Sequence, residues 1–184
     1  RSCARVIAVS RALARVLEGD GLDPDRVRVV YEGVPDRPPA AGGAAALQAL
    51  GIPPESPVVG NVAALTDHKD HFTLIEAAAR VVARNSDVRF LIIGDGELRP
   101  RLEARSKALG LSAHCVFAGF RADLDALIPA FTVFCLSSSM EGLGTSLLDA
   151  MAFGRPVVAT RAGGIPEAVE DGVTGRVTAP DPRA

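Results

Sequence analysis

Short apolar segments alternate along the chain with longer amphipathic ones, a pattern typical of repeated units of β-strand followed by α-helix. Strands are expected at residues 6–9, 27–31, 58–64, 88–93, 115–118, 132–136 and 156–160. Helices are expected at residues 11–18, 72–84, 97–109, 124–130, 145–153 and 166–170. Residues 35–46 are rich in Pro, Gly and Ala and are expected to form a flexible connection.

Several of the expected strands are apolar throughout, among them Phe90-Leu91-Ile92-Ile93 and Val157-Val158-Ala159. Such runs are typical of strands that helices cover on both faces, and therefore of a parallel sheet. Repeated units of about 25 residues imply right-handed crossovers between the strands. The sequence predicts an α/β fold with a Rossmann-like, doubly wound parallel sheet. In such folds ligands bind beyond the carboxyl ends of the strands, so the loops that follow the strands are the place to look for a site.

The balance of charges argues against partners that need a strongly basic protein. Lys and Arg number 20 and Asp and Glu number 22, which gives a formal net charge of -2. No nucleic-acid partner and no direct contact with an anionic membrane is expected from this composition. The longest apolar stretch, residues 127–136, is interrupted by Pro129 and Thr132 and is shorter than the roughly 20 residues that span a bilayer.

The cysteines are scattered, and none belongs to a C-x-x-C pair. Cys115 and Cys135 each lie in an apolar run, where a cysteine is expected to act as a small buried hydrophobic residue, and the third is Cys3. An odd number of cysteines and the absence of a signal peptide fit a reducing compartment, so a cytoplasmic location is expected. The chain begins at Arg1 without a methionine, and we expect it to be a fragment of a longer protein.

The most informative loop follows the expected strand at residues 132–136 and reads Ser-Ser-Ser-Met-Glu-Gly-Leu-Gly before the helix at residues 145–153. Free backbone N–H groups and the positive end of the helix make such a loop a site for an anion. Gly142 and Gly144 would let a phosphate approach the backbone closely. The loop therefore predicts a phosphate-binding site.

Two carboxylates bracket this helix start. Glu141 precedes the helix and Asp149 lies eight positions later, about 12 Å along a helix axis. Thr145 and Asp149 share one face at a spacing of four. This layout can place a carboxylate at each end of a diphosphate that carries a hydroxylated group on both sides, as a nucleotide sugar does. On spacing alone an alternative stays open, in which Glu141 caps the helix and Asp149 is a solvated surface residue.

A family resemblance adds to this interpretation. Residues 141–160 resemble the E-x7-E signature of retaining, nucleotide-sugar-dependent glycosyltransferases with the GT-B fold, family 4 (group 1). The resemblance continues through Gly163-Gly164-Ile165-Pro166-Glu167 and Asp171-Gly172-Val173-Thr174-Gly175. Upstream, Val6-Ile7-Ala8-Val9-Ser10 and Glu32-Gly33-Val34 are similar to the family's entry into its C-terminal domain. The resemblance covers nearly the whole chain, in the family's order of motifs.

The resemblance implies roles for individual residues. Glu141 would bind hydroxyls of the donor sugar near the reacting carbon, and Lys69 would neutralise the leaving diphosphate. No metal ion and no cofactor are expected, because the helix start and Lys69 would carry the stabilisation of the leaving group. The remaining donor contacts implied by the resemblance are the backbone N–H groups of Gly142, Leu143, Gly144 and Thr145 for the diphosphate, Asp149 for the ribose hydroxyls, and Phe120 and Arg121 for the region of the base.

Three positions depart from the family's pattern. The second acid of the signature is Asp149 rather than glutamate, one methylene shorter. The arginine that the family places five residues before the lysine is Ala64, and the glycine that usually follows the lysine is Asp70. These changes leave Lys69 with less cationic support near a diphosphate.

The resemblance implies that residues 1–184 are the C-terminal, nucleotide-sugar-binding domain of a GT-B glycosyltransferase whose N-terminal acceptor domain lies outside the chain. The whole enzyme would move a sugar from a nucleoside diphosphate to a hydroxyl acceptor with retained configuration. Its partners would be the nucleoside diphosphate sugar and its own N-terminal domain, and any peripheral association with a membrane would run through that domain. The isolated chain is expected to bind donor and to turn over little.

Two other functions stay open from the sequence. A sugar-nucleotide epimerase of related architecture would use the same phosphate-binding helix, and a non-catalytic nucleotide-binding module would keep the site without turnover.

Single features of the sequence also have simpler structural interpretations. The run Asp67-His68-Lys69-Asp70-His71 could be a metal cluster or a helix start, and the triplets at residues 23–25 and 123–125 are expected to cap helices. Gly94-Asp95-Gly96 could border a nucleotide or form a turn, and Gly163-Gly164 is expected to be a structural turn.

Overall fold

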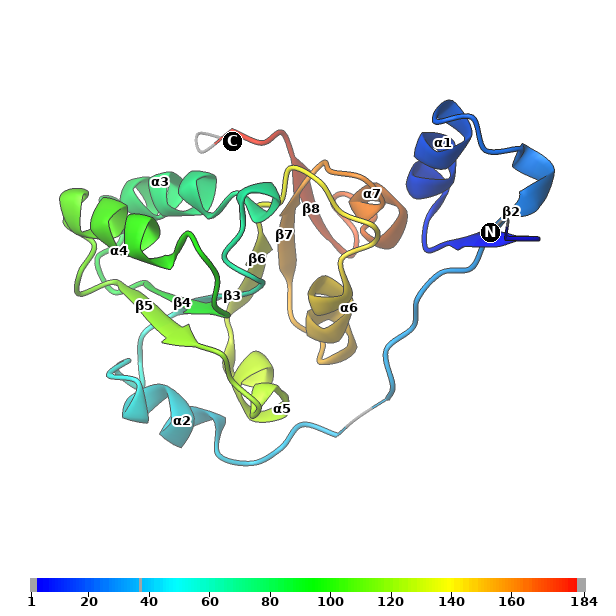
Figure 1. Cartoon of the computed structure of the whole chain (residues 1–184). Coiled ribbons are helices and arrows are strands. Elements are labelled where there is room, and N and C mark those ends of the chain that lie inside the picture. The colour runs from blue at the N-terminus through cyan, green and yellow to red at the C-terminus, as the bar shows by residue number, and fades with distance from the viewer. Residues whose placement is uncertain (1–2, 37, 182–184) are drawn as a thin grey trace.

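The computed structural model describes residues 3–36 and 38–181, and most of them surround one six-stranded parallel sheet (Figure 1). Arg1, at which the chain begins, lies outside the described residues. The strands are β3 (Val58–Val62), β4 (Arg89–Ile93), β5 (Cys115–Gly119), β6 (Val133–Leu136), β7 (Val157–Thr160) and β8 (Gly175–Thr178). Their order in the sheet is β5-β4-β3-β6-β7-β8. Within this sheet the chain begins at β3 in the middle and proceeds through β4 to the edge strand β5. It then returns to β6, beside β3, and proceeds through β7 to β8 at the other edge, which confirms the predicted doubly wound fold.

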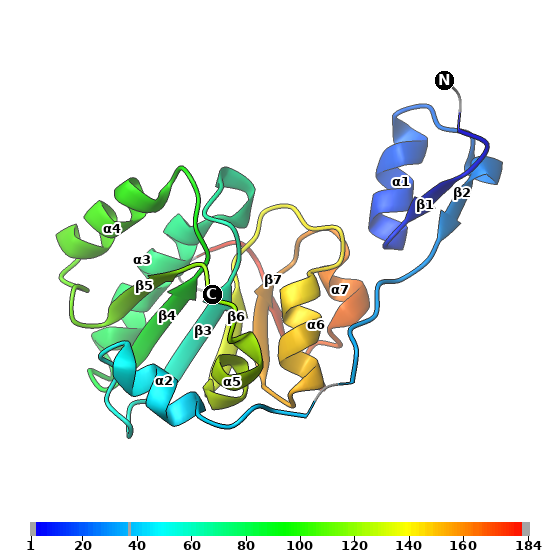
Figure 2. The ribbon, with the colours of Figure 1, turned by 60° about the horizontal axis from the view of Figure 1, so that its bottom comes forward.

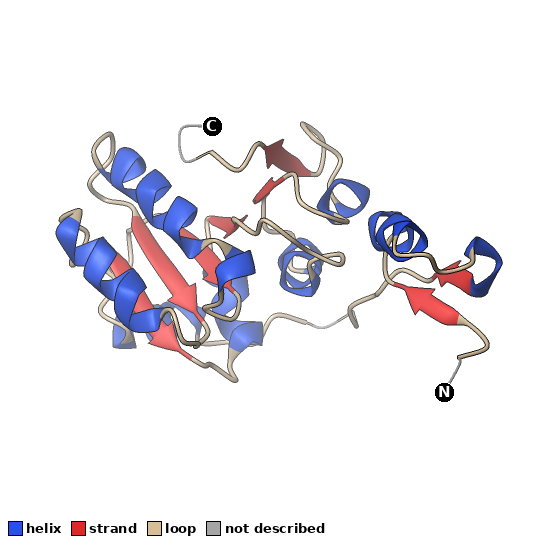
Figure 3. Cartoon of the chain, turned by 45° about the horizontal axis from the view of Figure 1, so that its top comes forward, coloured by secondary structure: helices blue, strands red, loops and turns tan. Residues whose placement is uncertain are grey.

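Helices cover both faces of this sheet (Figures 2 and 3). The helices on one face are α3 (His71–Val82) and α4 (Arg99–Ala108), and those on the other are α2 (Gly43–Ala49), α5 (Leu124–Leu127), α6 (Thr145–Ala152) and α7 (Ile165–Ala168). Strand β4 shows why two layers form. Phe90 and Ile92 pack toward α3 and α4, whereas Leu91 and Ile93 pack on the opposite side, because successive side chains of a strand point to opposite faces.

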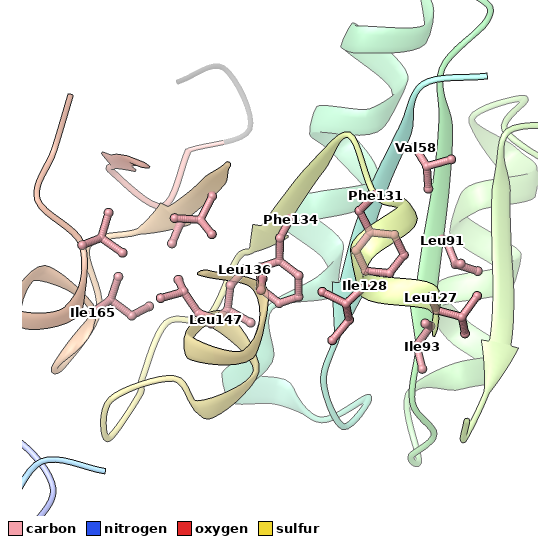
Figure 4. Packing of buried hydrophobic residues seen from close by; sticks show 14 of the residues in the cluster. Val58, Leu91, Ile93, Leu127, Ile128, Phe131, Phe134, Leu136, Leu147 and Ile165 are labelled. Carbon is pink, nitrogen blue, oxygen red and sulfur yellow. The ribbon is translucent and has the colours of Figure 1, made fainter. Parts of the chain in front are cut away.

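The larger core lies between the sheet and helices α2, α5, α6 and α7. Phe131, Phe134 and Leu147 are almost completely buried there, and Figure 4 shows them in one continuous layer with the strand residues. Burying one such side chain contributes about 1.5–3 kcal/mol, so this layer fixes the sheet against α6. The site loop before α6 is therefore anchored to a well-packed element.

Residues 3–34 form a unit of their own, set apart from the large sheet (Figures 1 and 2). Strands β1 (Val6–Ala8) and β2 (Val27–Val29) pair in parallel, with α1 (Arg11–Gly19) packed on one face. Ile7 and Val30 point away from α1 and are 67% and 54% exposed. Residues 30–36 and 38–42 then lead to the large sheet without helix or strand.

Two regular elements were not predicted. Helix α2 lies within and just after the stretch expected to be a loop, because the run Ala44-Ala45-Ala46-Leu47 is a strong helix former behind a pair of glycines. Strand β8 was missed because it is a short edge strand bounded by Gly175 and contains Arg176. A short 3-10 helix, Pro24–Arg26, also precedes β2.

Two smaller expectations can be compared with the structure. Cys115 is buried, as predicted, and burial raises the pKa of its thiol to about 11, whereas Cys135, which was expected to be buried as well, is only partly buried. Among the described residues, none of the helices combines the length and the apolar character that crossing a bilayer requires.

Candidate active site

The site lies where the winding of the sheet changes direction. Strands β3 and β6 are neighbours, and from them the chain proceeds to opposite edges of the sheet. The loops that leave the carboxyl ends of such a pair diverge and open a crevice, which is the usual ligand site of doubly wound sheets. Here those loops are residues 63–70 after β3 and residues 137–144 after β6.

The two residues to which the resemblance assigns catalytic roles lie in these two loops and contact each other. Lys69 comes from the loop after β3 and Glu141 from the loop after β6, and Lys69 Nζ lies 2.5 Å from Glu141 Oε1. The side chains are only 19% and 9% exposed, so water screens this ion pair less than a surface pair. The hydroxyl of Ser138 donates a hydrogen bond to the same carboxylate oxygen at 2.9 Å. The structure therefore brings the predicted lysine and glutamate together.

Hydrogen bonds from serine residues join the two loops to each other. Ser137 Oγ donates to the carbonyl oxygen of Lys69 at 3.0 Å, and Ser139 N donates to the carbonyl of His68 at 2.8 Å. Ser138 is completely buried, and its carbonyl accepts a hydrogen bond from the hydroxyl of Thr160 at the end of β7. The ion pair thus rests on backbone that three strands hold in place.

The start of α6 has the features of an anion site. Its N-cap is Gly144, at a φ of 90°, which has no side chain to accept hydrogen bonds from the first-turn amides. Thr145 is the first helical residue and Asp149 lies one turn further on, as the spacing predicted. The Thr145 hydroxyl donates to Glu32 Oε2 at 2.9 Å, so a carboxylate of the chain itself lies at this helix start. Gly142 and Leu143 lie between this point and Glu141.

Gly163 and Gly164 support the Glu141 loop from behind. The Gly164 amide donates to the carbonyl of Glu141 at 3.2 Å. A Cβ at Gly163 would lie 1.8 Å from that carbonyl oxygen, and one at Gly164 would lie 2.1 Å from the carbonyl oxygen of Gly142. The pair forms the turn that the sequence predicted, and the absence of side chains lets this turn pack directly against the backbone of residues 141 and 142.

Phe120 and Arg121 lie in the loop after β5, in a different place from the Lys69–Glu141 pair. A cavity of about 370 Å³ at the carboxyl ends of β3, β4 and β5 is lined by Val62, Ala63, Ala64, Ile93, Gly94, Asp95, Phe120, Arg121 and Leu124. Phe120 is 83% exposed, which suits a ring that stacks on a planar ligand. Arg121 forms two hydrogen bonds to Asp123, at 2.8 and 2.6 Å, so its guanidinium is held rather than extended toward a phosphate.

The metal interpretation of residues 67–71 is not supported by the geometry. Among the described residues, no group of three or more His, Cys, Asp or Glu side chains is placed to hold a metal ion. Asp70 instead caps α3, accepting from Thr73 N at 3.2 Å and from Thr73 Oγ1 at 2.7 Å. His71 is buried against Asn61, with Nε2 3.0 Å from Oδ1.

The structure explains one departure from the family pattern. Asp70 has a φ of 44°, and among the described residues it is the one non-glycine with positive φ. Glycine adopts this backbone conformation without strain, whereas here the Asp70 carboxylate offsets the cost by capping α3. Its negative charge is directed to the helix start and not to Lys69. Of the two Asp-x-Asp triplets, Asp23 caps the 3-10 helix through Asp25 N, whereas Asp123 binds Arg121 instead of capping.

Two contacts at the site were missed from the sequence. The sequence gives Ser138 no role, although it lies only three positions before Glu141, to which its hydroxyl donates. Glu32 had been noted in the resemblance without a role, and no local pattern could show that it reaches Thr145, 113 positions away.

The unit of residues 3–34 is attached to the large sheet through Glu167. The Arg11 and Ala12 amides, at the start of α1, donate to the two carboxylate oxygens of Glu167 at 2.9 and 2.7 Å, and the Tyr31 hydroxyl donates at 2.8 Å. Partial burial opposes ionisation of Glu167, but these hydrogen bonds outweigh it and hold its pKa below the ordinary value. The Ser10 hydroxyl accepts a hydrogen bond from the Leu13 amide. The first-turn amides of α1 are therefore bonded by one side chain of its own unit, Ser10, and by one from the large sheet, Glu167.

Replacing Glu167 by alanine is expected to loosen this attachment. Loss of a helix-capping carboxylate costs about 1 kcal/mol, so amide exchange of Arg11 and Ala12 should accelerate about fivefold. Hydrogen exchange followed by mass spectrometry would measure this. Glu170→Ala, which removes an exposed acid three residues away, is the control. Unchanged exchange in Glu167→Ala would show that the carboxylate does not hold the unit.

Comparison with known proteins identifies the family. A family model described as "Glycosyl transferases group 1" matches residues 44–184. The chain belongs to this family. It is 38% identical over 126 residues to the lipopolysaccharide core biosynthesis glycosyltransferase LpsE of Rhizobium meliloti, a match to 68% of this chain and 36% of that protein. It is 37% identical over 161 residues to a D-inositol 3-phosphate glycosyltransferase of Mycobacterium sp. (strain KMS), a match to 83% of this chain and 36% of that protein.

Solved structures share the fold. HepE of Anabaena, determined in complex with UDP-glucose, superposes with a TM-score of 0.89 at 31% identity over 98% of this chain and 51% of that one. The lipopolysaccharide glycosyltransferase WaaG superposes with a TM-score of 0.80 at 22% identity, over 95% of this chain and 49% of that one. The architecture is the α/β fold of GT-B glycosyltransferases. The chain spans about a third or less of the curated relatives it matches and about half of the solved ones.

Proposed function

We propose that this chain supplies the donor site of a retaining glycosyltransferase that transfers a sugar from a nucleoside diphosphate to a hydroxyl acceptor. The observation that supports this best is the Lys69–Glu141 pair at the switch point of the sheet, beside the start of α6. A cation for a leaving diphosphate, an acceptor for sugar hydroxyls and a helix N-terminus for phosphate oxygens meet there. Membership of the group 1 family fits the same reaction.

In the proposed mechanism the diphosphate lies on the amides of residues 142–145, and Lys69 moves from Glu141 to a phosphate oxygen. Glu141 is then released to accept hydrogen bonds from the sugar. The bond between the sugar carbon and the phosphate oxygen breaks, and its electron pair stays with the diphosphate. The acceptor oxygen bonds to the same face of the sugar carbon, and its proton passes to the departing phosphate oxygen. Lys69 and the helix start stabilise the developing charge, and no metal ion is required.

The other donor contacts are proposed from their positions. Asp149, one turn into α6, would bind the ribose hydroxyls. The base would occupy the cavity beside Phe120, whose exposed ring can stack on it. HepE, at 31% identity, was determined with UDP-glucose, so uridine nucleotides are the first ligands to test.

We also propose a boundary between two domains at residues 35–42. The family model begins at residue 44, and the six-stranded sheet begins only at β3. A parallel sheet is stable when both of its faces are covered, and the face of β1 and β2 that carries Ile7 is exposed. We propose that residues 3–34 complete an N-terminal acceptor domain, so that residues 44–184 alone would form the donor domain, and not the whole of residues 1–184 as the resemblance implies.

Calorimetric titration with UDP, GDP, ADP and their sugar conjugates, with magnesium and with EDTA, tests the donor site. We expect one nucleotide to bind independently of metal. Lys69→Ala and Asp149→Ala should each weaken its binding about tenfold or more, since hydrogen bonds to charged groups are worth about 1.5–3 kcal/mol. Glu141→Ala should weaken binding of the sugar conjugate, which loses the acceptor for its hydroxyls. It should not weaken binding of the bare nucleotide, because Lys69 stays free to bind the diphosphate. Glu103→Ala, an exposed acid on α4, is the control. No binding by the folded chain at millimolar nucleotide would contradict the proposal.

A further inference from the structure

A buried histidine that the proposed mechanism does not use, His71, lies two residues after Lys69 in the chain. His71 is completely buried, and its Nε2 is 3.0 Å from Asn61 Oδ1. Asn61 is itself only 1% exposed and donates from Nδ2 to the carbonyl of Cys135 at 2.9 Å. These contacts join strand β3, strand β6 and the first residue of α3.

The hydrogen bonds determine which nitrogen of the ring carries the proton. A carbonyl can only accept, so the amide nitrogen of Asn61 faces Cys135 and its oxygen faces His71. That oxygen also can only accept, so His71 must donate from Nε2. His71 Nδ1 is buried and has no hydrogen-bond partner among the described residues, which fits an unprotonated nitrogen. Burial, with a contribution from the charge of Lys69, lowers the pKa of His71 to about 4, so the ring is neutral at physiological pH.

A short stretch of backbone connects this ring to the site. Only Asp70 separates His71 from Lys69, and it has a fixed left-handed conformation and is bonded to Thr73. On the other side, the Lys69 carbonyl accepts from Ser137 at the end of β6. The hydrogen bond of the ring to Asn61 and the cap formed by Asp70 therefore both hold the backbone from which Lys69 extends.

We propose that neutral His71, bonded to Asn61, is a positioning residue that fixes Lys69 for its contact with Glu141 and with the donor diphosphate. The proposal rests on the donor-site function given above. It differs from a purely structural role, in which His71 would add to stability without affecting Lys69.

A double-mutant cycle on UDP affinity separates these roles. In His71→Leu the donor to Asn61 is lost, and we expect UDP to bind about tenfold more weakly. In His71→Gln the side-chain amide restores an N–H group, and affinity should return to within about threefold of wild type. In the Lys69→Ala background, His71→Leu should change affinity less than about twofold, since its effect passes through Lys69. Titrations well below the melting temperature of each variant keep unfolding out of the comparison.

Equal losses in the two backgrounds, or no loss in His71→Leu, would overturn the proposal while leaving the donor site intact. A wild-type chain that binds no nucleotide would instead remove the proposed function, and this inference with it. If His71→Leu does not fold, the nitrogen NMR spectrum of the wild-type ring decides. We expect Nε2 protonated and Nδ1 bare from about pH 6 to pH 8, in the free and UDP-bound chain. In His71→Gln the Lys69 ammonium resonance should stay close to its wild-type position, because the glutamine N–H group replaces the lost donor to Asn61. A proton on Nδ1, or a displaced Lys69 resonance in His71→Gln, would overturn the proposal.

Discussion

Replacing Gly163 by alanine is expected to disable the donor site, whereas the same change at Gly154 should leave it intact. A Cβ at Gly163 would lie 1.8 Å from the carbonyl oxygen of Glu141, so that the Glu141 loop must move. At Gly154 no atom lies within 4 Å of the added Cβ. Both glycines have positive φ, 49° and 67°, so the backbone strain of about 1–2 kcal/mol is common to both variants.

The difference between the two variants therefore isolates the contact with Glu141. We expect Gly163→Ala to lose about 2–4 kcal/mol of unfolding free energy, from overpacking added to strain, and to bind a sugar nucleotide more than tenfold more weakly. Gly154→Ala should lose about 1–2 kcal/mol and keep its affinity. Urea unfolding and calorimetry measure the two quantities. Equal affinity in the two variants would show that Gly163 does not determine the position of Glu141.

Acidification is expected to destabilise the protein through His71. Its pKa is about 4 in the folded chain against an ordinary value of 6.5. Between these values the unfolded chain binds a proton that the folded chain does not, so lowering the pH favours unfolding. The stability that the neutral ring contributes is fully present above pH 6.5 and is lost as the pH falls toward 4. A difference of about 2.5 pKa units corresponds to about 3 kcal/mol.

Comparison with His71→Gln separates this effect from the titration of carboxylates, because glutamine carries no titratable proton. The unfolding free energy, measured in urea from pH 7.5 to pH 4.5, should fall more steeply in the wild type than in the variant. Lys69 and Asp70 face the ring and act in opposite directions on its pKa, so Lys69→Ala should shift the transition to higher pH. Parallel curves for wild type and His71→Gln would contradict this account.

The sheet and the site loop could be predicted from the sequence because their signals are local. The apolar runs of β4 and β7 reflect burial on both faces, and Gly142 and Gly144 mark a loop that runs into a helix. Edge strand β8 is short and half-polar, so it has no clear local pattern. The helix-forming residues of α2 directly follow a stretch rich in glycine and proline, which hides where the helix begins.

The supporting contacts of the site could not be predicted, because they join residues far apart in the chain. Spacing and resemblance together indicated Glu141 and Lys69 as members of one site, but not that they form an ion pair with each other. The contacts of Glu32 with Thr145 and of Glu167 with α1 depend on how two separate sheets pack. His71 was considered as a metal ligand, because a sequence does not show that a histidine points into the core.

The pairing of Lys69 with Glu141 has a consequence for the competition between substrate and spent nucleotide. Without ligand, the Lys69 ammonium and the Glu141 carboxylate neutralise each other, and both side chains are largely shielded from water. A nucleoside diphosphate that binds Lys69 leaves the partly buried Glu141 carboxylate with the Ser138 hydroxyl but without its counter-ion, which is costly. An intact sugar nucleotide removes that penalty, because its hydroxyls replace the ammonium as donors to the carboxylate. The site would then hold the loaded donor more tightly than the by-product, and an enzyme built on it would resist inhibition by its own leaving group.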